Sequence, residues 1–201
     1  MSQPTILAII LAGGQATRMQ GQDKGLLLLH GKPLVQWVIE RLQPQLQTLV
    51  INANRNTKIY QQWNYPVLTD LPIHPQQGPL GGIASVMATL PADYYLTVPC
   101  DCPRLPLDLL ARLQPAALPA CAHDGQRLQP LFSLLPAAVL LNLQAYLASG
   151  QRHTQRWLEA QGVHPVDFAD QAAAFANLNT PDELYELSTN PAGLPIEPPT
   201  P

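Results

Sequence analysis

A glycine-rich segment followed by two cations lies near the start of the chain. It reads Leu11-Ala12-Gly13-Gly14, ends an apolar run, and precedes Arg18 and Lys24. Adjacent glycines let the backbone approach a ligand closely and point its N–H groups at anionic oxygens. Arg18 and Lys24 can neutralise phosphate charge from two sides, and the spacing fits neither a P-loop nor a dinucleotide-binding fingerprint. We therefore predict a triphosphate-binding loop, with a glycine-rich surface turn and two solvated cations as the alternative.

Asp101 follows a second apolar run, residues 94–98. In doubly wound sheets, ligands bind beyond the carboxyl ends of the strands. A carboxylate at that place can hold Mg²⁺, which prefers oxygen ligands and shares them with substrate phosphates. The alternative is an aspartate that caps a helix after Pro103. Cys100 and Cys102 flank Asp101, but no second cysteine pair accompanies them, so we interpret them as small packing residues rather than zinc ligands.

Further polar and glycine-rich positions are expected at the same edge of the sheet. Gly78 opens the segment 78–82, which begins a helix whose N-terminus favours anions, although an ordinary turn is the better explanation of this segment taken alone. Asn52 and Asp70 end short strands, and a carboxylate such as Asp70 can accept hydrogen bonds from guanine. A role in turn formation is equally good for both. Asn177 and Asn179 are candidates for contact with a second substrate, or they satisfy loop backbone groups.

The pattern of apolar residues predicts an α/β domain with a mostly parallel sheet, because short apolar runs alternate with helical patterns. Strands are expected at 6–11, 48–52, 66–69 and 94–98, and helices at 33–46, 57–63, 78–90, 106–113, 136–148 and 154–161. Asp124-Gly125 predicts a hairpin turn between two further strands. A capping box that starts at Thr180 predicts a last helix through Leu187. Residues 1–188 are therefore expected to form a single domain, and the Pro-rich residues 189–201 a disordered tail.

Composition narrows the class of ligand. The 201 residues carry a net charge of -3 and only 12% charged residues, without a basic block, which argues against a nucleic-acid partner but leaves small anionic ligands open. No apolar run is long enough for a membrane helix. The three cysteines and the lack of a signal-like N-terminus predict a reduced, cytoplasmic chain. The five histidines show no ligand spacing, so none is assigned a catalytic role.

Taken together, the motifs resemble those of the molybdenum cofactor guanylyltransferases, the MobA type within the nucleotidyltransferase superfamily. The resembling segments, which occur in the order seen in the family, are 11–19, 23–26, 31–34, 52–55, 78–82, 99–103 and 177–181. One departure is Met19-Gln20, where the family often has Met-Gly and this chain has its glycine at Gly21. The resemblance implies a Rossmann-like three-layer sandwich of the nucleotide-diphospho-sugar transferase type.

The resemblance also implies an activity. A Mg²⁺-dependent enzyme of this family transfers GMP from GTP to the terminal phosphate of molybdenum-molybdopterin, which forms the guanine dinucleotide cofactor and releases pyrophosphate. Arg18, Lys24 and Asp101 are the catalytic candidates, and Asp101 is the metal ligand. The expected nucleotide contacts are Leu11, Ala12, Gly13, Gly14, Lys24, Asn52, Asp70, Gly78 and Asp101. Molybdenum insertion proteins and molybdoenzyme chaperones are the expected protein partners.

Three alternatives stay open at this point. The first is cytidylyl transfer to molybdopterin, the second is nucleotidyl transfer to a sugar phosphate, and the third is a non-catalytic nucleotide-binding protein. Base choice depends on Asn52, Asp70 and backbone groups whose positions the sequence does not give.

Overall fold

A seven-stranded sheet forms the centre of the protein, with strand order β5-β4-β1-β6-β8-β7-β9. The computed structural model describes residues 4–13, 23–73 and 77–178. The strands are β1 (Ile6–Leu11), β4 (Leu49–Asn52), β5 (Val67–Leu68), β6 (Tyr94–Pro99), β7 (Ala120–His123), β8 (Leu128–Pro136) and β9 (His164–Asp167). Among the described strands of this sheet, β8 alone runs against its neighbours β6 and β7, and the other pairs are parallel. The predicted α/β class with a mostly parallel sheet is therefore confirmed.

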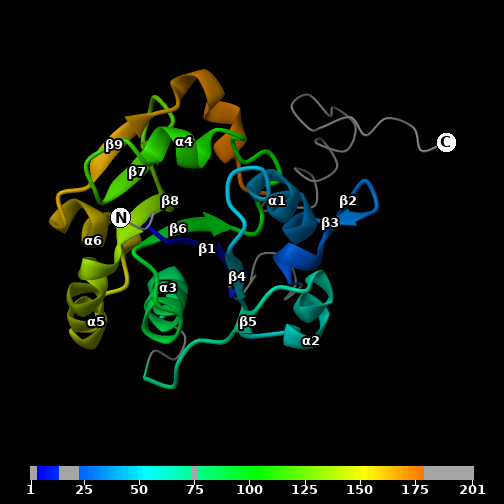
Figure 1. The fold of residues 1–201 in the computed structure, drawn as a ribbon, viewed down its shortest axis with the longest axis horizontal. Helices are drawn as coiled ribbons and strands as arrows, with labels where there is room; N and C mark the ends of the chain where they lie inside the picture. Colours follow the sequence, from blue (N-terminus) through cyan, green and yellow to red (C-terminus); the bar gives the residue numbers. More distant parts are fainter. Residues whose placement is uncertain (1–3, 14–22, 74–76, 179–201) are drawn as a thin grey trace.

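Helices cover both faces of the sheet. They are α1 (Leu34–Leu42), α2 (Thr57–Tyr60), α3 (Gly78–Thr89), α4 (Leu109–Leu113), α5 (Leu140–Ala148) and α6 (Thr154–Ala160). Short 3₁₀ segments are η2 (Lys24–Leu26), η3 (Gln61–Trp63), η4 (Ala137–Val139) and η5 (Ala169–Phe175), and a small hairpin joins β2 (Leu28–Leu29) to β3 (Lys32–Pro33). Figure 1 shows α1 and α4 on one side of the sheet and α3 and α5 on the other.

The side chains of β1 explain these layers. Alternate residues of a strand point to opposite faces. Ala8 and Ile10 pack in one buried cluster with α1 and α4, whereas Leu7 and Ile9 pack in a second cluster with α3, α5 and α6. Because both faces of β1 are covered, its sequence reads as a continuous apolar run rather than as an alternation. The three-layer sandwich implied by the resemblance is thus confirmed.

Helix boundaries depart from the prediction where prolines intervene. The first helix ends at Leu42 rather than at Leu46, because Pro44 has no N–H to donate to the carbonyl of residue 40. Pro136 is the last residue of β8 instead of the first of a helix. Residues 106–108 form a turn, and α4 begins only at Leu109. The predicted hairpin turn is confirmed, since Asp124 N donates to Arg127 O across the β7–β8 connection.

The elements that were not predicted from the sequence are η2, the β2–β3 hairpin, β9 and η5. Each strand of the hairpin has only two residues, too few to show a period, and the hairpin turns at His30 and Gly31, both with positive φ. Strand β9 lies at the edge of the sheet and is mostly exposed, so it lacks an apolar pattern. The predicted last helix with its capping box, and the Pro-rich tail, lie outside the described residues.

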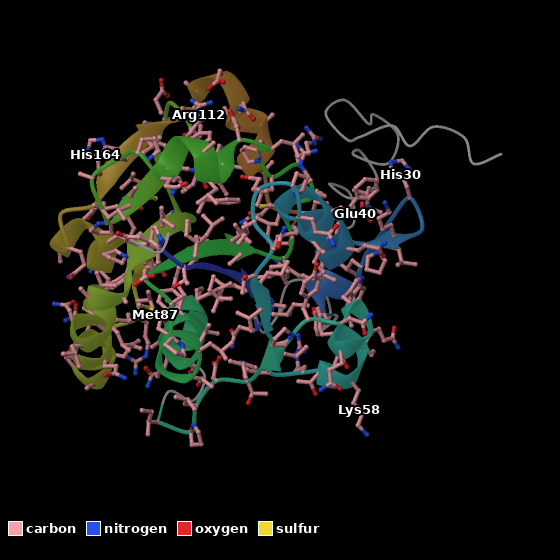
Figure 2. All side chains as sticks on the ribbon, viewed as in Figure 1. His30, Glu40, Lys58, Met87, Arg112 and His164 are labelled. Atoms are coloured by element: carbon pink, nitrogen blue, oxygen red, sulfur yellow. The ribbon has the colours of Figure 1, made fainter. Side chains whose placement is uncertain are left out.

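Arg112 of α4 binds the segment that follows β9. Its guanidinium donates to both carboxylate oxygens of Asp170 over 3.0 Å each. It also stacks 4.0 Å from the ring centroid of Phe168. Figure 2 shows Arg112 on α4 where that helix meets this segment. The contacts fix the path along which the chain returns to the carboxyl edge of the sheet at Asn177 and Leu178.

Candidate functional site

The ends of four parallel strands bring the predicted site residues to one edge of the sheet. Leu11, the last residue of β1, is in register with Asn52 of β4 and with Pro99 of β6. Asn52 is in turn in register with Leu68 of β5. The residues that follow these strands, among them Gly13, Asp70 and Asp101, therefore leave the sheet at the same edge, as the sequence predicted from the parallel topology.

Two of the catalytic candidates form an ion pair at this edge. Lys24 Nζ lies 3.1 Å from Asp101 Oδ2, and the Asp101 side chain is only 9% exposed. Asp101 does not cap the next helix, because the N-cap of α4 is Asp108. The capping alternative is therefore wrong for Asp101. Its carboxylate instead pairs with Lys24, one of the two cations predicted to bind a triphosphate.

A buried hydrogen-bond network holds the backbone next to Lys24. The Asp23 carboxylate accepts from the Tyr60 hydroxyl over 2.6 Å and from Asn56 Nδ2 over 3.1 Å. Burial raises the pKa of Tyr60, and Cys100 and Asp23 raise it further, so the phenol stays protonated and donates. A side chain at Gly25 would collide with the Tyr60 hydroxyl. This network was not predicted from the sequence, where the position of Asp23 directly before Lys24 was the available signal.

Asn52 and Asp70 are joined by a hydrogen bond, and Asn52 is the more buried of the two residues. Asn52 is 2% exposed, and its Nδ2 donates to Leu68 O over 3.2 Å and to Asp70 Oδ1 over 3.1 Å. The Asp70 backbone N–H donates to Asn54 Oδ1 over 2.8 Å. Asn52 thus fixes the orientation of the Asp70 carboxylate rather than facing open solvent itself.

Glycine is required at position 82 by this arrangement. A Cβ on Gly82 would overlap the Asn52 amide, with Oδ1 as its nearest atom. We expect Gly82→Ala to lower the free energy of unfolding by about 1–3 kcal/mol, the usual cost of overpacking. The displaced Asn52 amide would also release Asp70, so affinity for the nucleotide predicted from the sequence should fall. Denaturant unfolding and calorimetric titration measure the two effects. In an Asn52→Ala background the same substitution should cost little, and an equal cost there would contradict this explanation.

The amino end of α3 reaches the same edge. Gly78 has φ +65°, and a Cβ at this position would meet nothing within 4 Å, so backbone conformation rather than crowding explains the glycine. Gln77 precedes it as the N-cap residue but makes no side-chain capping bond. Its Oε1 is buried and has no hydrogen-bond partner within the part of the chain that the structure describes. The helix start therefore offers uncapped backbone N–H groups.

Leu11, the last residue of β1, and the two residues after it, Ala12 and Gly13, lie within the described residues. Leu11 and Ala12 are buried, and Ala12 N donates to Asn52 O over 2.8 Å. Gly13 is partly exposed and lies beside the Asn52 and Asn54 side chains. The other predicted site residues of this loop and of the last motif, Gly14, Arg18 and Asn179, lie outside the described residues.

A cavity of ≈ 480 Å³ adjoins the edge on the side of β8. It is bounded by the end of β6, the start of α3, the first half of β8 and the start of α6. Its lining residues are Pro79, Pro99, Arg127, Leu128, Gln129, Pro130, Leu131, Phe132, Arg152, His153, Thr154, Gln155 and Asn177. Of these, only Asn177 is a ligand candidate predicted from the sequence. Two arginines are among the lining residues: Arg127 Nε lies 3.9 Å from Asp124 Oδ2, and Arg152 Nη1 donates to Leu147 O over 2.8 Å.

His153 has a defined orientation in this cavity. Its Nδ1 accepts a hydrogen bond from Arg156 N over 3.3 Å as the N-cap of α6. Nδ1 is therefore unprotonated, and the ring proton of the neutral imidazole sits on Nε2, which is a donor. This histidine was not predicted to have a role, although its position directly before a helical pattern was a usable signal. Figure 2 labels two other histidines, His30 at the tip of the β2–β3 hairpin and His164 on β9.

Two kinds of feature are absent from residues 4–13, 23–73 and 77–178. No three side chains of His, Cys, Asp or Glu gather there as a metal-binding group. In the same ranges, no helix has the length and apolar character needed to cross a membrane. All three cysteines are buried and unpaired, as expected for packing residues.

Comparison with known proteins identifies the family of this chain. Residues 8–166 match the MobA-like NTP transferase domain. The chain belongs to this family. A molybdenum cofactor guanylyltransferase from Vibrio cholerae is 48% identical over 183 residues, which are 89% of this chain and 89% of the relative. The family predicted from the motifs is therefore confirmed, and the chain is a nucleotidyltransferase.

Solved structures of the family's fold agree with the topology. Molybdopterin-guanine dinucleotide biosynthesis protein A from Archaeoglobus fulgidus superposes with a TM-score of 0.76 at 21% identity, covering 93% of this chain and 98% of that chain. A 4-diphosphocytidyl-2C-methyl-D-erythritol synthase from Anaerococcus prevotii superposes with a TM-score of 0.71 at 11% identity, covering 94% and 96%. The fold is thus shared by proteins named for different nucleotides, so the fold alone does not select the base.

Proposed function

We propose that this protein transfers GMP from GTP to the terminal phosphate of molybdenum-molybdopterin, with release of pyrophosphate. The observation that carries the proposal is the Lys24–Asp101 pair at the carboxyl edge, in a chain 48% identical to a molybdenum cofactor guanylyltransferase. A cation and a carboxylate at such an edge suit a metal-bound nucleotide.

The nucleotide lies across the ends of β1, β4, β5 and β6 in this proposal. The backbone after Leu11, at Ala12, Gly13 and Gly14, approaches the nucleotide closely, while Lys24 and Arg18 neutralise its phosphates. Asp70 accepts from guanine N1–H and the exocyclic amine, a pair of donors that suits a carboxylate. The bond from Asn52 Nδ2 to Asp70 Oδ1 supports this role, because it fixes the carboxylate before the base arrives. The start of α3 at Gly78 adds uncapped N–H groups near the edge.

The residues present fit a magnesium ion at Asp101. Its Oδ2 pairs with Lys24, and its Oδ1 has no hydrogen-bond partner among the described residues, so one carboxylate oxygen is available. A single carboxylate suits Mg²⁺, which takes its other ligands from phosphates and water. The ion, when bound, supplies positive charge against the phosphate oxygens.

The acceptor occupies the cavity beside β8. Arg127 and Arg152 attract its terminal phosphate, and His153 Nε2 and Asn177 offer hydrogen-bond donors. Asn179 joins them from the same motif as Asn177. An acceptor phosphate is already ionised near neutral pH, so positioning and charge neutralisation provide most of the rate without a strong general base. Molybdenum insertion proteins upstream and molybdoenzyme chaperones downstream are the partners that this substrate and product require.

Burial rules the cysteines out as nucleophiles. Cys100 and Cys102 lie next to Asp101, and burial raises the pKa of both thiols well above the ordinary value, with the Asp101 charge raising them further. Both are therefore protonated at neutral pH and lack the thiolate that covalent catalysis needs. Direct attack by the acceptor phosphate on the nucleotide is the route that the described side chains support.

Calorimetric titration with GTP, CTP, ATP and UTP, each with Mg²⁺, tests the proposal. We expect GTP to bind about tenfold or more tightly than the others, since one well-placed pair of hydrogen bonds is worth about 1.5–3 kcal/mol when an acceptor is charged. An Asp70→Ala variant should reduce this preference. Tighter binding of CTP would point to cytidylyl transfer, and turnover with a sugar phosphate but not with molybdenum-molybdopterin would point to the other alternative.

A further inference from the structure

A carboxylate in the β7–β8 connection holds one side chain in the wall of the cavity beside β8. Asp124 Oδ1 accepts from the backbone N–H groups of Gln126 and Arg127 over 2.8 Å each. Its Oδ2 accepts from Gln129 Nε2 over 2.6 Å, and the Asp124 side chain is only 13% exposed. The turn thus fixes the Asp124 carboxylate, which presents one oxygen to Gln129.

The charge of Asp124 decides which end of the Gln129 amide it binds. Burial opposes ionisation of Asp124, but the hydrogen bonds from Arg127, Gln126 and Gln129 outweigh burial and keep its pKa below the ordinary value. An ionised carboxylate only accepts hydrogen bonds, so it binds the amide nitrogen and not the amide oxygen. Gln129 Nε2 is therefore held, and Oε1 points away from Asp124.

The Gln129 side chain lies on the face of β8 that borders the cavity. Leu131 packs in the cluster formed with α3, α5 and α6, and Gln129, two residues earlier on the same strand, shares that face. The starts of α3 and α6 bound the cavity on this face, and Gln129 is one of its lining residues.

The oxygen of this amide is open to a ligand. Within the part of the chain that the structure describes, Gln129 Oε1 has no hydrogen-bond partner, and Gln77 Oε1 is the only buried side-chain nitrogen or oxygen without one. Gln129 Oε1 is therefore accessible. Gln155, the other glutamine of the cavity wall, donates to Glu159 on the exposed surface of α6, where water competes for the bond. Gln129 thus offers the more firmly oriented acceptor.

We propose that Gln129, oriented by Asp124, recognises the pterin ring of the acceptor by accepting a hydrogen bond from one of its N–H groups. The inference rests on the proposed function, because it takes the cavity as the acceptor site. A pterin ring carries an amino group and ring N–H groups, whereas an ionised phosphate offers only acceptor oxygens. The cavity volume of ≈ 480 Å³ is in the usual range for a small-molecule site. Gln129 is then a specificity-determining residue, and Asp124 a positioning residue.

Steady-state kinetics of Gln129→Met test the contact, since methionine keeps the length of the side chain and removes the amide oxygen. We expect KM for molybdenum-molybdopterin to rise about five- to tenfold, the effect of losing one hydrogen bond, with kcat and the Kd for GTP unchanged. Inhibition by free pterin should weaken by the same factor. Inhibition by inorganic phosphate, which has no N–H group, should be equal in the two proteins.

An exchange of the two side chains tests the orientation. Asp124→Asn presents an amide nitrogen to Gln129 and reverses its amide, so the acceptor KM should rise at least as much as in Gln129→Met. In the double variant Asp124→Asn/Gln129→Glu, the asparagine donates to the glutamate, whose second oxygen again accepts from the ring. Its acceptor KM should return to within about threefold of wild type.

Gln36→Met is the matched control. Gln36 Nε2 on α1 donates to the Glu40 carboxylate over 3.1 Å, which is the same kind of pair away from the cavity. This variant should keep the acceptor KM and the inhibition by pterin of wild type. A rise in the acceptor KM equal to that of Gln129→Met would show that the effect is not specific to the cavity and would overturn the proposal.

The remaining outcomes separate this inference from the proposed function. An unchanged acceptor KM in Gln129→Met, weaker inhibition by phosphate rather than by pterin, or a double variant as impaired as Asp124→Asn would overturn the role of Gln129 alone. Wild-type protein that binds no GTP, or that does not transfer GMP to molybdenum-molybdopterin under anaerobic conditions, would overturn the proposed function and this inference with it.

Discussion

We expect the Asp101→Asn variant to release pyrophosphate in the presence of Mg²⁺ about a thousandfold more slowly than wild type, as when metal-based charge stabilisation worth several kcal/mol is lost. Asparagine keeps the shape of the side chain but lacks the anionic oxygens. It also removes the charge that Lys24 faces across 3.1 Å. A coupled pyrophosphate assay across a range of Mg²⁺ concentrations measures the loss, which excess metal should not fully repair.

The control for this variant is Asp93→Asn. Asp93 precedes β6 at the opposite edge of the sheet and accepts hydrogen bonds from Thr5, which an asparagine oxygen can still accept. Its turnover should equal that of wild type. The Asp101→Asn protein should also keep its melting temperature within a few degrees, because its backbone bond from Leu178 is unaffected. Turnover of Asp101→Asn within a few-fold of wild type would remove Asp101 from the mechanism.

The second large effect is expected from Lys24→Met, which keeps the aliphatic stem and removes the ammonium. We expect its Kd for GTP to rise about 10- to 100-fold, since a charge-assisted hydrogen bond to a phosphate oxygen is worth about 1.5–3 kcal/mol. Calorimetric titration at two salt concentrations measures this loss. The affinity of the variant should also depend less on salt, because one cation fewer faces the triphosphate.

Lys58 provides the matched lysine. It is exposed on α2, and Figure 2 shows its side chain directed away from the body of the protein. Lys58→Met should therefore bind GTP as wild type does. An unchanged Kd for GTP in Lys24→Met would mean that Lys24 only pairs with Asp101 and does not bind the nucleotide. Equal losses of GTP affinity in Lys24→Met and Lys58→Met would indicate a general effect of net charge.

The set of residues at the carboxyl edge of the sheet was predictable from two facts: the strands could be recognised in the sequence, and parallel strands end at the same edge. Buried parallel strands such as β1 leave continuous apolar runs, and the residues that follow them share an edge. That reasoning placed Lys24, Asp70 and Asp101 together before any side-chain position was known. Asn52 was also placed correctly, but its nearly complete burial, and hence its action through Asp70, required the structure.

Contacts between distant segments were not predictable in the same way. Asp23 meets Tyr60 across 37 residues, and Cys102 meets Asn177 across 75. Neither pair belongs to a periodic pattern, and each depends on how two loops pack side by side. The cavity beside β8 was missed for the same reason, because its walls come from β6, α3, β8 and α6 at once.

The antiparallel orientation of strand β8 determines which loop of this fold can be altered without changing the nucleotide-binding edge. Because β8 runs against β6 and β7, the β7–β8 connection at residues 124–127 lies at the same edge as the carboxyl ends of the parallel strands. Arg127 at its end lines the cavity, while none of the nucleotide-side residues belongs to this connection. A hairpin loop tolerates insertion and substitution far better than a buried strand. Under the proposed function, new loops at residues 124–127 would therefore change the acceptor site while the nucleotide-binding edge stays unchanged.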